Sequence, residues 1–188
     1  MNWLNTLAIL LVAFLAVFAE SYFRGLRTLL GAQIDLLPAL VVYASLSTTL
    51  STVALVTTLG GFWFDSLSAN PLGISVLPLF VVGLVIHYCR DLILREQIYA
   101  QFMLGLTASA VVPLLTVLSL IGAGADPLLS WSSLWQWLVM ALGGAMFTPV
   151  LFHFFDRFNR AFNYRPQSQT SFRPDREIKR DRGPHVDY

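Results

Sequence analysis

The chain has 188 residues, of which 56% are hydrophobic and 12% are charged. Soluble domains average about 25% charged residues. The surplus of apolar side chains therefore excludes an ordinary soluble domain and indicates an all-α polytopic membrane protein. The formal net charge of +1 is unevenly spread, because most of the Lys and Arg residues follow residue 156. The single cysteine, Cys89, excludes an intrachain disulfide.

The first apolar run, Trp3 to Tyr22, has the length that a membrane-spanning helix needs, about 20 residues. No Lys or Arg precedes it, whereas a signal peptide usually begins with a positive region. We therefore expect this run to remain as a first membrane helix.

The segment from Leu29 to Phe64 is too long for one span, since a single helix of that length would measure about 54 Å. Its middle is rich in Ser and Thr. Two short helices, over about 33–47 and 49–64, with a tight turn near Ser47–Thr49, would accommodate both features. This interpretation gives six spans in all, and one longer segment with five spans is the alternative.

Three further runs complete the expected bundle. The chain between the last two runs, from Gly122 to Pro127, has strong loop chemistry. A proline interrupts each run and removes one backbone donor, so that neighbouring helices must satisfy the freed carbonyls. The runs are Leu72–Tyr88 with Pro78, Ile98–Ile121 with Pro113, and Trp131–Phe155 with Pro149.

Small residues four positions apart predict close packing between helices, because they let backbones approach in a membrane. Their abundance in membrane helices is the alternative explanation. The pairs are Ala141/Ala145, Gly144/Thr148, Ser47/Ser51 and Thr48/Thr52.

The distribution of arginines bears on the topology, because cytoplasmic loops carry an excess of positive charge. Six spans place Arg90, Arg95 and the tail in the cytoplasm, but leave Arg24 and Arg27 outside. Five spans place all of them in the cytoplasm. The charge rule favours five spans and the length argument favours six. We adopt six.

The chain divides into a helical membrane domain over 1–162 and a basic tail over 163–188. The tail has too little apolar surface to form a core, which predicts a disordered cytoplasmic segment. Its positive charge would suit anionic lipid headgroups, and an ordinary stop-transfer flank is the preferred explanation.

Catalytic and metal-binding patterns are missing from the sequence. No His-Glu-x-x-His, Gly-x-Ser-x-Gly or phosphate-binding loop occurs. The best metal candidates, His87 and His153, stand alone near the ends of their runs, whereas zinc sites pair His or Cys at short spacing. We therefore expect no enzyme activity, no metal, no cofactor and no nucleic-acid partner.

The most informative residue is Asp65, an acid at the end of an apolar run, where an unpartnered charge is costly. It could reach the interface or cap the turn through Ser66 and Ser68. Alternatively, it could belong to an external polar notch, with Glu20, Asp35, Arg24 and Arg27 on the same side, that a partner contacts.

The residues around Asp65 carry a family resemblance. The stretch from Gly60 to Gly73, GGFWFDSLSANPLG, resembles the Gly-rich, Asp-Leu-x-Ser and Pro-Leu-Gly signature of MreD, the bacterial rod shape-determining membrane protein. The stretch from Gln33 to Tyr43 is similar to that family's Pro-Asp-Leu-Leu segment, with Ile34 in place of the usual proline. The candidate motif for partner binding or packing comprises Asp35, Gly61, Asp65, Asn70, Pro71 and Gly73.

The resemblance implies a non-enzymatic scaffold of the cell-elongation machinery in the bacterial inner membrane. Such a subunit binds MreC and supports lateral peptidoglycan synthesis and rod shape. It works indirectly with MreB, a RodA-type glycan polymerase and a class B penicillin-binding protein. The family fold is similar to that of substrate-binding subunits of energy-coupling-factor vitamin transporters.

A transporter subunit of that kind is the alternative function. Such subunits usually carry a small-xxx-small pattern in the first helix. Here the alanines of the first run, such as Ala8 and Ala13, have no small residue four positions on. This departure weighs against transport.

Overall fold

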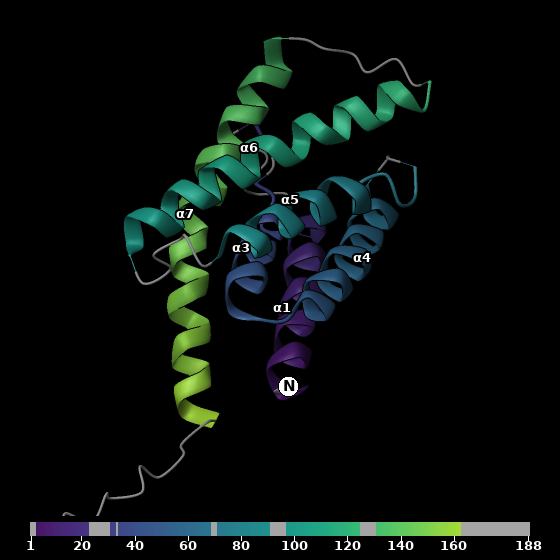
Figure 1. The fold of residues 1–188 in the computed structure, drawn as a ribbon. Coiled ribbons are helices and arrows are strands. Elements are labelled where there is room, and N and C mark those ends of the chain that lie inside the picture. Colours follow the sequence, from purple (N-terminus) through teal and green to yellow (C-terminus); the bar gives the residue numbers. More distant parts are fainter. Residues whose placement is uncertain are drawn as a thin grey trace, which may run out of the picture.

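The computed structural model describes residues 3–22, 31–32, 34–68, 71–90, 97–124 and 131–162. This part of the chain is all-helical and contains six helices (Figure 1). The basic tail, Arg24 and Arg27 lie outside the described residues. In chain order the helices are α1 (Trp3–Tyr22), α3 (Leu37–Ser47), α4 (Leu50–Leu67), α5 (Val76–Cys89), α6 (Ile98–Gly122) and α7 (Trp131–Phe162).

The short helix α3 forms the centre of the bundle. Every residue from Leu37 to Leu46 is buried, so the helix has no exposed face. A helix that is apolar all round must be covered on all sides, and α3 packs against α1, α4, α5, α6 and α7. The ring of Tyr43 stacks on Phe155 of α7 at a centroid distance of 4.4 Å.

The expected break between two short helices near Ser47–Thr49 is confirmed. Thr48 and Thr49 both adopt extended backbone conformations between α3 and α4. The hydroxyl of Thr48 donates to the carbonyl of Ala44 at 2.6 Å, which also accepts the Thr48 N–H. Side-chain bonds of this kind compete with the helical ladder. The Thr-rich sequence therefore ends α3 and restarts the helix as α4.

Helices α6 and α7 cross in close contact, and the predicted small pair Gly144/Thr148 lies at the crossing. A Cβ on Gly105 of α6 would meet the Thr148 hydroxyl and would lie 2.7 Å from the Gly144 carbonyl oxygen. A Cβ on Gly144 would lie 2.5 Å from the Cβ of Ser109. The two backbones can approach this closely only because both positions lack a side chain.

Beyond this crossing, a side chain of α7 donates a hydrogen bond close to the proline of α6. Pro113 has no N–H to donate, which frees the carbonyl of Ser109 one turn before it. The indole of Trp137 on α7 donates to the next carbonyl, that of Ala110, at 2.7 Å. The contact thus lies beside the freed carbonyl and not on it.

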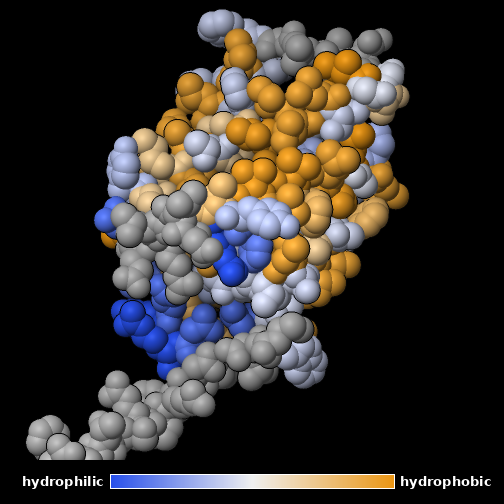
Figure 2. Space-filling view, viewed as in Figure 1, coloured by the Kyte–Doolittle hydropathy of each residue, from blue (hydrophilic) through white to orange (hydrophobic). Residues whose placement is uncertain are grey.

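Among the described residues, three helical segments are long and apolar enough to cross a membrane: Leu50–Leu67, Ile98–Gly122 and Ser133–Arg160. The remaining apolar helices are shorter. Hydrophobic side chains cover most of the face seen in Figure 2, and hydrophilic ones gather in its lower part. The start of α1 and the end of α7 lie toward the same end of the molecule (Figure 1).

Candidate functional site: the α4–α5 corner

Asp65 is buried at the end of α4, with 1% of its surface exposed. Its Oδ2 accepts the backbone N–H of Gly73 at 2.8 Å and that of Ser75 at 3.1 Å. Its Oδ1 accepts the Ser75 hydroxyl at 2.5 Å. The carboxylate therefore fixes the end of α4 to the chain that enters α5.

This arrangement has an electrostatic reason. Ser75 occupies the N-cap position of α5 but makes no side-chain capping bond. The N-terminal end of a helix carries a partial positive charge. A carboxylate from the preceding helix supplies the negative group there, and its three hydrogen bonds compensate for its burial.

Gly61, Pro71 and Gly73 of the motif shape the same corner, whereas Asp35 lies at the entry to α3. Gly61 allows α5 to start against α4, since a Cβ there would lie 2.8 Å from Cγ2 and 3.0 Å from Cα of Val76. Gly73 has φ of +88°, a conformation that favours glycine. The carbonyl of Pro71 accepts the N–H of Ile74 at 3.2 Å, which closes the turn. Asn70 lies outside the described residues.

The position of Asp65 differs from the first two expectations, that it reaches the interface or caps the turn through Ser66 and Ser68. The side chain does not extend to the surface, and Ser66 and Ser68 do not bind its carboxylate. The Ser66 hydroxyl donates to the carbonyl of Trp63 at 2.8 Å, and the Ser68 hydroxyl donates to the Asp65 backbone carbonyl at 3.3 Å. Asp65 anchors the next helix instead of capping its own.

Glu20 and Asp35 form a second acidic element, at the entry to α3. Glu20 Oε1 accepts the N–H of Leu36 at 2.6 Å, and Asp35 Oδ1 accepts the N–H of Leu37 at 2.9 Å. Two carboxyl groups thus bind successive backbone donors at the N-terminal end of α3, where negative charge is favoured. Burial raises the pKa of Asp35, in the loop before α3, because the carboxylate loses hydration there.

The structure brings together only part of the expected polar notch. The successive antiparallel helices place Glu20, Asp35 and Asp65 toward one end of the bundle. However, no hydrogen bond between described residues joins Asp65 to the other two acids. Each acid is engaged with backbone N–H groups, so the three act as separate anchors.

The two histidines considered as metal candidates lie far apart in the sequence and in different settings. His87 places Nδ1 3.0 Å from the carbonyl oxygen of Ser45, next to the α3–α4 break. His153 is exposed on α7. Within the described ranges, no group of three or more His, Cys, Asp or Glu residues could hold a metal ion.

Sequence reasoning missed Ser75 as a contributor to these sites, and it named Glu20 without its partner. Ser75 supplies two of the three donors to Asp65 but looks like an ordinary residue before an apolar helix. Glu20 binds a residue that lies 16 positions away. A serine ten residues after an isolated acid, across a Pro-Leu-Gly turn, is the one local signal that could have indicated the first pairing.

Comparison with known proteins adds nothing to this geometry: no family model, no curated protein and no solved structure matches the chain.

Proposed function

We propose that this protein is a non-enzymatic, six-span scaffold of the cell-elongation machinery in the bacterial inner membrane. It binds MreC and, through it, supports MreB, the glycan polymerase and the penicillin-binding protein that build the lateral wall. The basic tail lies in the cytoplasm. The proposal starts from the resemblance of residues 60–73 to the MreD signature.

One observation supports this proposal more than any other. The described residues of the signature converge on one rigid corner, with Gly61 at the helix contact, Asp65 as the anchor and Gly73 in the turn. An acid that is buried and bonded to three donors is suited to holding a shape. A motif with this geometry fits a protein that presents a surface to a partner.

The partner surface that we propose consists of the side chains that this corner exposes. Leu67 is 52% exposed and Leu72 is 70% exposed, one on each side of the turn. Pro71 is also exposed. Apolar side chains held by a rigid turn lose little conformational freedom on binding, which favours affinity. MreC would contact these residues while Asp65 maintains their positions.

Depletion of the protein in its rod-shaped host, followed by microscopy, tests the function. We expect cells to widen and become round as the protein is lost. Purification from the same host should recover MreC. Unaltered rods would refute the proposal, and recovery of an ATPase-coupled module with a bound vitamin would favour the transporter function instead.

A pair of leucine variants tests the surface. Leu72→Ala should reduce the recovery of MreC about tenfold, the loss expected when one exposed apolar anchor is removed. Leu11→Ala is the matched control, because Leu11 is 61% exposed on α1, outside the corner. Equal recovery with both variants would exclude the corner as the MreC surface.

A further inference from the structure

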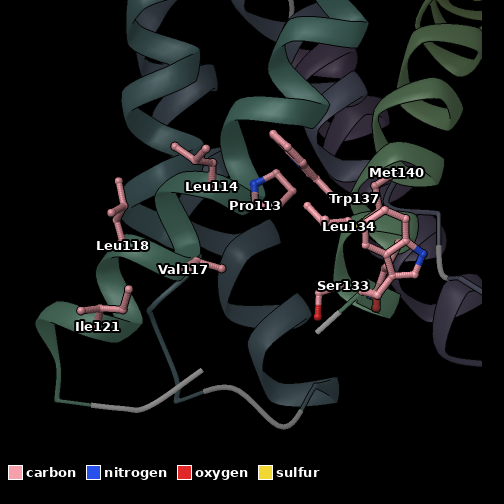
Figure 3. A pocket seen from close by; sticks show the side chains of 11 residues that line it. Pro113, Leu114, Val117, Leu118, Ile121, Ser133, Leu134, Trp137 and Met140 are labelled. Atoms are coloured by element: carbon pink, nitrogen blue, oxygen red, sulfur yellow. The ribbon is translucent and has the colours of Figure 1, made fainter. Parts of the chain in front are cut away.

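The ends of α6 and α7 diverge beyond their crossing and leave an open apolar groove of about 690 Å³. Figure 3 shows Pro113 and Val117 of α6 facing Leu134 and Trp137 of α7 across this space. Leu118, Ile121 and Met140 extend the apolar lining. The close contact of the two helices at Gly105 and Gly144 lies farther along the bundle.

We propose that this groove binds one acyl chain of a membrane phospholipid, with the headgroup at the end where α7 begins. The proposal depends on the membrane placement of α6 and α7. It does not depend on MreC as the partner, so the two proposals can fail separately.

The length of the groove fits this occupant. On α6 the lining runs from Pro113 to Ile121, about 12 Å, and on α7 from Trp131 to Met140, about 14 Å. One leaflet offers about 15 Å, half of the hydrocarbon thickness, to an acyl chain. The groove therefore matches the length of a lipid tail in one leaflet.

The two ends of the groove differ in polarity in the way that a lipid requires. The end toward the helix crossing is lined by Pro113, Trp137 and Met140. The outer end holds Ser133 together with Trp131, which is 85% exposed at the start of α7. Gln136 lies midway along the lining. Tryptophan is enriched at the level of the headgroups. A lipid would thus place its tail inward and its polar end beside these residues.

Two leucines on α7 provide a matched test. Leu134 lines the groove and is 53% exposed, whereas Leu138, one turn farther on, is 50% exposed and is not among the lining residues. Leu134→Trp should fill the groove, and Leu138→Trp should leave it open. Phospholipid retained after exhaustive detergent washing is measured by native mass spectrometry on the full-length protein.

We expect one phospholipid to remain on the unaltered protein and on Leu138→Trp, and about tenfold less on Leu134→Trp. Equal retention by the two variants, or none by the unaltered protein, would overturn the proposal.

If Leu134→Trp does not fold, a second experiment uses the unaltered protein. A phospholipid with a photoreactive tail is cross-linked to it, and the labelled residues are identified. Labelling concentrated on 113–121 and 131–140 supports the groove. Equal labelling of α1, or cross-linking of a second copy through the groove, contradicts it.

Discussion

At the scale of single residues, the buried acids of this protein fix the positions at which helices start. Asp65 anchors the entry to α5, and Glu20 and Asp35 anchor the entry to α3. Each carboxylate binds backbone N–H groups that would otherwise lack a partner in an apolar environment. The acids are thereby tolerated among apolar helices, and the helix starts gain fixed positions.

Asp65→Asn should lower the free energy of unfolding by about 2–4 kcal/mol, because hydrogen bonds to a charged group contribute about 1.5–3 kcal/mol each. An amide can also present an NH₂ group to donors that need an acceptor. Thermal unfolding in detergent, followed by circular dichroism, measures the change. Ser75→Ala removes only the hydroxyl donor and should cost less. An Asp65→Asn protein as stable as the original would refute the anchoring role.

Glu20→Gln should leave the stability unchanged or raise it slightly. The amide oxygen can still accept the N–H of Leu36, and a neutral amide costs less to bury than a carboxylate. Glu20→Ala leaves that N–H without its acceptor and should cost about 1–3 kcal/mol. The same unfolding measurement compares the two variants. A larger loss with glutamine than with alanine would contradict this explanation.

At the scale of the elements, the α6–α7 pair is held by the absence of side chains at its crossing. Gly105 and Gly144 each lie against the partner helix, whose hydroxyls and backbone fill the space that a Cβ would need. Backbone atoms cannot move aside as a flexible side chain can. The crossing should therefore be sensitive to a single added methyl group.

Gly105→Ala should destabilise the protein by about 1–3 kcal/mol, the usual cost of overpacking. Gly122 in the same helix is the control, because a Cβ there would meet nothing within 4 Å. Gly122→Ala should be neutral or stabilising, since alanine favours the helix by about 0.5–1 kcal/mol. The unfolding midpoints of the two variants, measured in the same detergent, compare their stabilities. Similar midpoints for the two variants would show that the crossing tolerates side chains.

The structural features were predictable from sequence to different degrees, because some depend on neighbouring residues and others on contacts between distant parts of the chain. The break at Thr48–Thr49 followed from local length and polarity. The small pair Gly144/Thr148 indicated a contact but not its partner, because Gly105 lies about 40 residues earlier on a different helix. The bond between Asp65 and Ser75 was missed, since it depends on how two helices meet and leaves no periodic pattern in the chain.

At the scale of the whole molecule, the helices form a bundle around α3 with the two described chain ends toward one side (Figure 1). When successive helices run in opposite directions, an even number of helices brings both ends of the chain to the same side. The arrangement fits the six-span topology that we propose, in which the N-terminus and the basic tail share the cytoplasm.

Reporter fusions test this topology directly. A reporter at residue 2 and another after Tyr188 should both respond as cytoplasmic, because six crossings return the chain to its starting side. A reporter inserted in 125–130, between α6 and α7, is the control and should respond as periplasmic. A periplasmic signal at residue 2 would eliminate the six-span topology.

The complete burial of α3 has a consequence for biosynthesis. Its 11 residues make a helix of about 16 Å, about half the hydrocarbon thickness, so in the proposed topology α3 crosses only inside the bundle that surrounds it. Two of the helices that cover it, α6 and α7, are synthesised only after it has left the ribosome. An early insertion intermediate must therefore shelter α3 beside α1, α4 and α5 until the last two helices arrive.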